Sequence, residues 1–157
     1  MANKTSIIQN NAFADFNEEL LGLGTTYLSL IVFDKSSNVI ISKSSNPDWS
    51  SEFMETGLYK DCHLLQAASS LMSINDSFLL VWDTVSPSEE KQKNLEEIRK
   101  QKNIMHGVGF CSKDLLGNKV FLNIAGKYSD INFGLNVLKE RKEVYKKMHD
   151  FLLKTFI

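Results

Sequence analysis

Five residues carry the thiol and imidazole groups that zinc sites and thiol nucleophiles use: Cys62, His63, His106, Cys111 and His149. Cys62 and His63 are adjacent, and neighbours on a helix point about 100° apart, so they form a poor chelating pair. His106 and Cys111 are separated by an odd number of residues, so on a regular strand they face opposite sides of the sheet. A metal- or thiol-dependent enzyme that uses Cys62, His63 and Cys111 is an alternative that this spacing argues against.

Other catalytic patterns in the sequence also argue against an enzyme. The paired glutamates fall in the lysine-rich segment 86–102, where a solvated charged face explains them. The glycine pairs in 22–24 and 107–109 have no lysine at the spacing of a phosphate-binding loop, and they do not join a strand to a helix. We therefore expect a protein that is not an enzyme and that has no catalytic residues, no metal and no cofactor.

Large aromatic side chains form the more informative set. Trp49 and Phe53 are one helical turn apart and share a face. Each aromatic residue alone is typical of a core, but a buried indole N–H or phenol O–H needs a partner, which a ligand carbonyl can supply. Asp61 adds an acceptor for a ligand amide, although a helix cap explains it equally well. The residues that we predict to form the wall of a small-molecule pocket are Trp49, Phe53, Tyr59, Asp61 and Trp82.

The composition is that of an ordinary globular domain. The chain has 157 residues, of which 43% are hydrophobic and 24% are charged, and its net charge of −1 gives no basic field for nucleic acid. The longest apolar runs are too short for a bilayer, and the first residues lack the pattern of a signal peptide. Two cysteines are too few for a secreted disulfide scaffold. We expect a cytoplasmic protein that binds no membrane and, through this chain alone, no nucleic acid.

Hydrophobic periodicity and turn residues predict the elements of the first half of the chain. Asn46 caps a helix whose first residue is Pro47, and Gly57 ends it. This helix carries both Trp49 and Phe53. The other elements expected here are a helix over 9–22, a hairpin of strands 25–34 and 39–43, and a second helix over 59–72.

The second half continues with a short, almost wholly apolar run over 78–82, which predicts a strand in the centre of the sheet. Ser86 and Glu89 form a capping-box pattern at the start of a helix whose sparse apolar positions predict a mainly solvated element. The remaining elements are a hairpin of strands 104–113 and 118–126, then a long helix from about residue 130. Its expected apolar stripe comprises Leu138, Tyr145, Met148 and Leu152, flanked by Val144 and Phe151.

This order of elements, α-ββ-αα-β-α-ββ-α, predicts the fold class. Strands that follow one another as hairpins pair antiparallel, and the helices between them must cover the faces of the resulting sheet. We therefore expect an α/β (α+β) protein, namely an α-β-α sandwich like PAS and GAF sensor domains. It should have a mainly antiparallel five-stranded sheet with helices on both faces. No linker divides the chain, so residues 1–157 should form a single domain.

Three stretches carry a family resemblance: "NPDWSSEFMETGLYKD", "FLLVWDTVSP" and "MHGVGFCSKDLLGNKVFLNIAG". Together they resemble the N-terminal autoinducer-binding domain of LuxR-type transcription regulators over roughly residues 25–155. In that family a helix with a tryptophan leads to an acidic residue, a second tryptophan ends a strand, and a glycine begins a later strand. Phe53 takes the position of a family tyrosine, and Trp82 and Gly107 take those of the second tryptophan and the strand glycine.

The resemblance also implies roles for two residues of the predicted pocket. Trp49 matches the tryptophan whose indole N–H donates to the ring carbonyl of the ligand. Asp61, with one gap allowed, matches the aspartate that accepts the ligand amide N–H. Three departures favour a ligand different from an acyl-homoserine lactone: Cys62 stands where the family has proline, Phe53 lacks a hydroxyl, and Ser45 stands where many receptors have tyrosine.

The function that the resemblance implies is ligand sensing and dimerisation in a quorum-sensing regulator. The ligand would be a small amphiphilic signal such as an acyl-homoserine lactone or an analogue, and the final helix would form the homodimer surface. Family members continue into a helix-turn-helix domain, and we expect this DNA-binding domain to be absent from the present chain. The alternatives are a ligand-free GAF- or PAS-like protein-interaction module and a stand-alone short form that heterodimerises with a full-length regulator.

Overall fold

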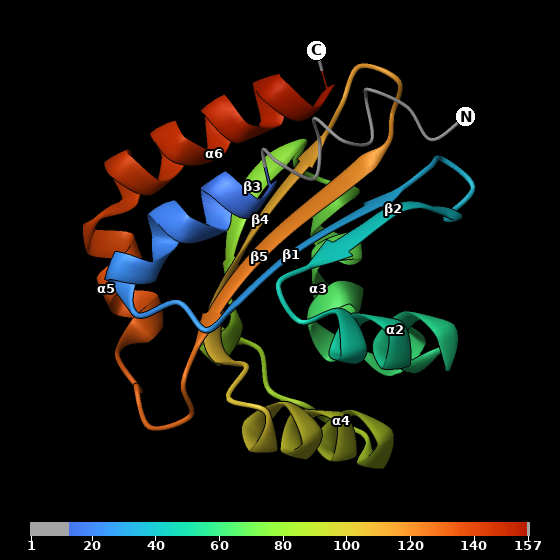
Figure 1. Ribbon diagram of the computed structural model, residues 1–157. Helices are drawn as coiled ribbons and strands as arrows, with labels where there is room; N and C mark the ends of the chain where they lie inside the picture. The colour runs from blue at the N-terminus through green and yellow to red at the C-terminus, as the bar shows by residue number, and fades with distance from the viewer. Residues whose placement is uncertain (1–12, 157) are drawn as a thin grey trace.

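A five-stranded antiparallel sheet runs through the centre of the molecule (Figure 1). The computed structural model describes residues 13–156. The strand order is β2-β1-β5-β4-β3, so β5 is central and β2 and β3 form the edges. The strands are β1 (Tyr27–Phe33), β2 (Val39–Ser44), β3 (Ser77–Val81), β4 (Met105–Lys113) and β5 (Lys119–Gly126). The antiparallel five-stranded sheet predicted from the sequence is confirmed.

Helical segments connect the strands and flank the sheet. Residues 13–20 are helical and continue into the 3₁₀ turn η1 (Leu21–Leu23), which ends at Gly24 with a positive φ of 83°. The predicted helix over 9–22 agrees from residue 13 onward, and 9–12 lie outside the described residues. Within residues 13–156, no helix is long and apolar enough to cross a membrane. The other helical elements are α2 (Pro47–Glu55), η2 (Leu58–Asp61), α3 (His63–Met72), η3 (Trp82–Thr84), α4 (Glu90–Gln101), α5 (Phe133–Lys139) and α6 (Arg141–Phe156).

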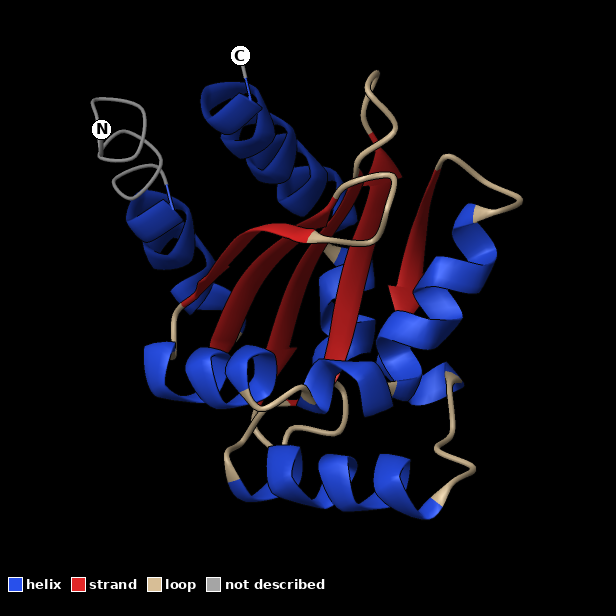
Figure 2. Ribbon diagram, turned by 90° about the vertical axis from the view of Figure 1, so that its right-hand side faces the viewer, coloured by secondary structure: helices blue, strands red, loops and turns tan. Residues whose placement is uncertain are grey.

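The alternation of side chains along the strands builds two separate cores. Leu28 and Leu30 of β1 point to a cluster that the helix over 13–20, α5 and α6 close, and we call this side of the sheet the α6 face. Tyr27 and Ile31 point to a second cluster with α2, α3 and α4, on the α3 face. The two helical layers lie on opposite sides of the sheet (Figures 1 and 2). The predicted α-β-α sandwich is therefore confirmed.

The apolar stripe of α6 is covered within the chain. Val144, Met148 and Phe151 are buried, and the Phe151 ring stacks on Phe16 with centroids 4.9 Å apart. Val144 and Phe151 were predicted only to flank the stripe, but they belong to the core. These three side chains therefore stabilise the α6 face and are not offered to a dimer partner.

The segment after residue 130 forms two helices where the sequence predicted one. The backbone of Glu140 leaves the helical region, with φ of −92° and ψ of 16°, so α5 ends there and α6 starts at the next residue. The break lets Phe133 of α5 pack on β5 while α6 follows a different line, and this moves the stripe by one position. Of the other predicted stripe residues, Leu138 is half-buried, and the side chains of Tyr145 and Leu152 lie outside the described part.

The predicted central strand over 78–82 is an edge strand. It forms β3, which pairs with β4 and ends the sheet. Leu80 belongs to the core of the α3 face, while Leu79 packs against the core of the α6 face. A continuous apolar run indicates that both faces of a strand are covered, and in this sandwich the edge strand β3 also meets that condition.

Two predicted helix starts are also wrong. The expected helix over 59–72 begins as the short 3₁₀ turn η2, and Cys62 then adopts an extended backbone, so α3 starts only at His63. The capping box of α4 joins Glu89 to Gln92 and does not use Ser86. Most residues of this helix are exposed or half-buried, as expected, but Gln92, Leu95 and Arg99 form a buried stripe that faces the core.

Gly107 allows the indole of Trp82 to lie directly on the backbone of β4. A Cβ atom at Gly107 would stand 2.7 Å from the Trp82 ring and 2.6 Å from the carbonyl oxygen of Ile124. On the opposite side of the same backbone, a Cβ at Gly134 of α5 would stand 3.1 Å from the carbonyl oxygen of His106. The glycine that the family resemblance singled out thus has a steric reason.

We expect Gly107→Ala to lower the free energy of unfolding by about 1–3 kcal/mol, because the added methyl group must displace the Trp82 ring or the sheet. Urea titration followed by circular dichroism measures the change. Gly22→Ala is the control, since nothing lies within 4 Å of a Cβ atom at that position. Equal losses in both variants would contradict the steric explanation.

Candidate ligand-binding site

A cavity lies between the α3 face of the sheet and the helices α2, α3 and α4. Its volume is about 40 Å³, which is room for roughly three water molecules. Most of the wall is apolar or aromatic, and four lining residues carry strongly polar groups. These polar residues are Tyr27, Ser29, Arg99 and Asn123. An apolar wall with a few polar groups is the usual character of small-molecule sites.

The structure brings together three of the five predicted pocket residues. Trp49 and Phe53 of α2 and Trp82 of η3 all line the cavity. Tyr59 and Asp61 do not line it. Tyr59 lies on η2, where its ring is 6.2 Å from that of Phe33 and borders a more open surface depression. Asp61 is half-buried at the end of the same turn.

Local structure fixes the position of Trp49. The side chain of Asn46 accepts a hydrogen bond of 3.1 Å from the Trp49 backbone N–H, and Pro47 occupies the first position of α2. The ring of Trp49 lies 5.4 Å from that of Phe53, one turn later. Trp49 is only 2% exposed, yet neither its indole N–H nor that of Trp82 donates to another described residue.

A polar row crosses the floor of the cavity at the centre of the sheet. Ser29 of β1 and Asn123 of β5 are register partners, and the Asn123 amide donates to the Ser29 hydroxyl over 3.4 Å. Beside them, burial raises the pKa of Tyr27, although hydrogen bonds with Ser44 and Ser29 oppose the shift. The sequence does carry a signal for this row: one polar residue at an inward position of each otherwise apolar strand.

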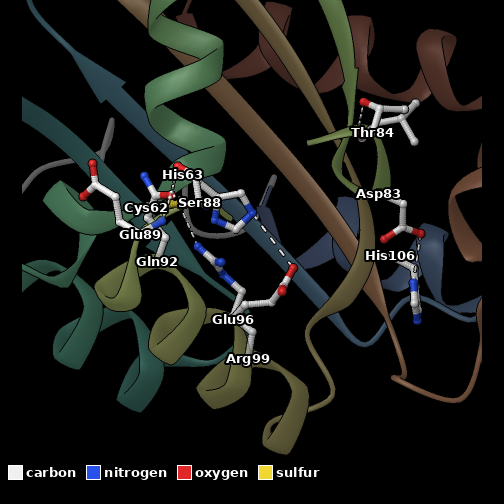
Figure 3. Close-up of polar contacts among 11 residues, drawn as sticks. Cys62, His63, Asp83, Thr84, Ser88, Glu89, Gln92, Glu96, Arg99 and His106 are labelled. Carbon is white, nitrogen blue, oxygen red and sulfur yellow. Dashed lines mark hydrogen bonds and ion pairs between the residues drawn. The ribbon is translucent and has the colours of Figure 1, made fainter. Parts of the chain in front are cut away.

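Arg99 places a positive charge in the roof of the cavity. It is 4% exposed and extends from α4 to the start of α3, where its Nη2 donates to the sulfur of Cys62 over 2.7 Å (Figure 3). The guanidinium carbon also lies 5.9 Å from the ring centre of Phe53 and 5.8 Å from that of Trp82. Sequence analysis missed Arg99 because it falls in a lysine-rich segment. Its helical spacing from Gln92 is the signal that could have found it.

The described cysteines and histidines are not grouped with one another. Burial raises the pKa of Cys111 to about 12, so this cysteine stays a neutral thiol in the wall of the cavity. His106 sits at a bulge in β4, where one ring nitrogen is 2.9 Å from Asp83 and the other is 2.8 Å from the carbonyl oxygen of Tyr128. In residues 13–156, no three His, Cys, Asp or Glu side chains are grouped to hold a metal.

No protein-family model matches the sequence, and no curated protein does either. Solved structures do match. The N-acylhomoserine lactone-dependent LuxR-family transcription factor CepR2 from Burkholderia cenocepacia aligns with a TM-score of 0.65 at 11% identity, over 96% of each chain. At this identity the likeness is one of fold.

A second regulator has the same fold over part of its length. Escherichia coli SdiA aligns with a TM-score of 0.63 at 11% identity, over 94% of the present chain and 61% of SdiA. SdiA in complex with octanoyl-rac-glycerol gives a TM-score of 0.65 at 12% identity, over 93% of the present chain and 59% of that one. The present chain therefore spans about three fifths of SdiA.

These matches define the class of fold as a sensor-type α-β-α sandwich. More particularly, it is the fold of the LuxR-type autoinducer-binding domain, as the three sequence stretches predicted.

Two histidines of this region should shift stability with pH in opposite directions. Burial and the nearby charge of Arg99 lower the pKa of His63, so the folded state prefers the neutral ring. Burial also opposes the charging of His106, but hydrogen bonds to Asp83 and to the Tyr128 carbonyl outweigh it and raise the pKa. The stability that His63 contributes is complete above about pH 6.5 and is lost as the pH falls below that value.

The test uses His63→Leu and the control His106→Asn, since asparagine tolerates the φ of 55° at position 106. We expect the stability advantage of the wild type over His63→Leu to shrink between pH 7 and pH 5. The difference between the wild type and His106→Asn should instead grow over the same range, because a raised pKa stabilises the protonated fold. Urea titrations at several pH values measure both differences, and parallel curves for His63→Leu and the wild type would contradict the assignment.

Proposed function

We propose that this chain is a ligand-sensing domain that binds a small amphiphile between the α3 face of the sheet and the helices α2 to α4. The observation that carries the proposal is that aromatic side chains meet around one cavity. Trp49 and Phe53 of α2 and Trp82 of η3 come from two separate parts of the sequence, yet they border one cavity with a polar floor and an unpaired Arg99 donor. An ordinary core has no need of unpaired donors and a polar row in its centre.

The chemistry of the wall supports an amphiphile. Its apolar residues suit an alkyl chain, while the indole N–H groups and the row of Ser29 and Asn123 suit carbonyl, amide or hydroxyl groups. The fold neighbours agree with this choice: CepR2 depends on an N-acylhomoserine lactone, and SdiA forms a complex with octanoyl-rac-glycerol. The departures at Phe53 and Cys62 leave the head group of the ligand open.

The small volume of the cavity indicates how ligand binding would be coupled to a conformational change. Pockets that hold drug-sized ligands measure roughly 300–1,000 Å³, and this cavity measures about 40 Å³. Binding therefore requires the layer of α2, η2 and α3 to move away from the sheet. A ligand that binds only the open arrangement shifts the population toward it and stabilises the fold by mass action. This coupling would turn binding into a signal.

One observation favours a second candidate, the protein-interaction module. The small volume is also that of a nearly filled core, as expected for a GAF- or PAS-like domain that acts only through protein contacts. Thermal unfolding with added octanoyl-glycerol or N-octanoyl-homoserine lactone separates the two. A ligand-dependent rise in Tm supports the sensor, and no rise with any amphiphile supports the module.

The proposal extends to the regulator as a whole. In it, the domain self-associates in the cytoplasm, and the ligand-bound dimer controls transcription through a DNA-binding region or a full-length partner. The fold shared with CepR2 and with about 60% of SdiA supports this part. Because the described stripe of α6 is buried, self-association would use another surface. Native mass spectrometry reports bound amphiphile and oligomeric state together.

Trp49→Phe tests the pocket assignment, because it keeps the apolar bulk and removes the indole donor. We expect the affinity for N-octanoyl-homoserine lactone to fall about fivefold to tenfold, which corresponds to one lost hydrogen bond. Isothermal titration calorimetry measures it. The control is Phe16→Leu on the α6 face, which should lower the melting temperature and leave the affinity unchanged. Unaltered binding by Trp49→Phe would place this residue outside the ligand site.

A further inference from the structure

The guanidinium of Arg99 is the one charged group in the cavity wall, and it is not fully paired. Its Nη2 donates to Cys62, but Nη1 is buried without a hydrogen-bond partner. A guanidinium presents its donors as a flat fork. Half of this fork is occupied by a weak sulfur acceptor, and the other half has no acceptor in the described part of the chain.

The charge of Arg99 is not neutralised either. Among residues 13–156, no carboxylate lies within ion-pairing distance of the guanidinium, and none lines the cavity. The guanidinium instead contacts the rings of Phe53 and Trp82 and the sulfur of Cys62, while Asp83 and Glu96 border a neighbouring pocket beyond ion-pairing distance. Ring faces attract a cation, but they do not replace the hydration that a buried charge has lost. The site is therefore complete only when an anion joins it.

The shape and charge of the site select the kind of anion. A carboxylate accepts two parallel N–H bonds from a guanidinium fork. Because Arg99 is the only basic residue among those that line the cavity, a single negative charge balances it, whereas a phosphate monoester would leave an excess. The rest of the wall is apolar and aromatic, which suits a hydrocarbon chain attached to the acid.

We propose that the ligand of this domain is an acyl carboxylate, such as a medium-chain fatty acid or an N-acyl amino acid, whose carboxylate binds Arg99. This proposal rests on the proposed function, because it names the head group of the amphiphile in the same cavity. The indole N–H of Trp49 and the polar row of Ser29 and Asn123 serve the neutral polar groups of such a ligand. Neutral lactones leave the charge of Arg99 unbalanced and bind more weakly.

A matched ligand pair tests the charge directly. N-octanoyl-homoserine lactone and its ring-opened form, N-octanoyl-homoserine, share the acyl chain and amide and differ by the hydrolysis of one ester bond. We expect the ring-opened carboxylate to bind the wild-type protein about tenfold or more tightly than the lactone at pH 7.4, because it forms a charge-assisted pair. Octanoate and octanoyl-glycerol form a second pair without an amide. Isothermal titration calorimetry gives all four affinities.

Variants then assign the effect to one side chain. Arg99→Met should reduce carboxylate affinity about tenfold or more and leave lactone affinity within about twofold. Arg99→Lys keeps the charge and loses the fork, so its carboxylate affinity should be intermediate. The control is Lys102→Met. Lys102 is a cation near the Trp49 ring, but it does not line the cavity, so this variant should change neither affinity.

Thermal unfolding without ligand separates this role from a structural one. Replacing a buried, unpaired charge with an apolar residue of similar size is often neutral or stabilising, so ligand-free Arg99→Met should melt at or above the wild-type temperature. A lower melting temperature would mean that the ring and sulfur contacts already satisfy Arg99, and it would overturn the proposal.

The outcomes distinguish the two proposals. Preference of the wild type for the lactone, or unchanged carboxylate binding by Arg99→Met, overturns the carboxylate ligand while the sensor function stands. Binding of none of the four amphiphiles to the wild type overturns the sensor function as well. Carboxylate preference in the wild type and in Lys102→Met, with its loss in Arg99→Met, supports both.

Discussion

Everything in this molecule depends on a sheet whose two faces are both covered. A strand in such a sheet must be apolar on both sides, and β1 and β5 meet this demand except at Ser29 and Asn123 and at Lys119, where β5 begins. Ser29 and Asn123 are register partners at the centre of the sheet, so their polarity is concentrated in one place. A polar pair there costs stability unless it is satisfied. The helices above it leave a small space instead of filling it with aliphatic side chains, and this space becomes the candidate site.

The aromatic residues and Arg99 give this space its character. Trp49 is fixed by the cap of α2, and Trp82 is fixed by the bare backbone of Gly107, so both indoles are held by local structure and not by each other. The third group, Arg99, reaches the same space from α4, where it donates to the Cys62 sulfur and lies near the rings of Phe53 and Trp82. The site therefore combines rigid apolar walls with one charge that the protein itself does not balance. Such an arrangement suits recognition better than it suits folding stability.

Much of the fold could be predicted from local patterns, because period-two and period-3.6 spacing report the element type directly. The convergence of Trp49, Phe53 and Trp82 was predicted from the same patterns and the family resemblance.

Features that depend on tertiary position were not predicted from the sequence. The apolar run of β3 reports two covered faces and says nothing about the order of strands. Arg99 looks like its solvated neighbours until the packing of α4 turns it inward, and the break at Glu140 follows from how α5 and α6 meet the sheet. For Tyr59 and Asp61, the extended backbone of Cys62 ends the predicted helix and keeps them on η2, away from the cavity wall.

The glycines of β4 and α5 have one more consequence. At Gly107 the sheet carries no side chain on the α3 face, and Gly134 brings α5 against the other side of the same backbone, so the two helical layers are separated by little more than a peptide plane. Elsewhere in the sheet, side chains lie between the backbone and the helices and can adjust to small displacements. At Gly107 no such side chain is present. A tilt of the Trp82 ring would press directly on the backbone of β4, and a shift of that backbone would press on α5.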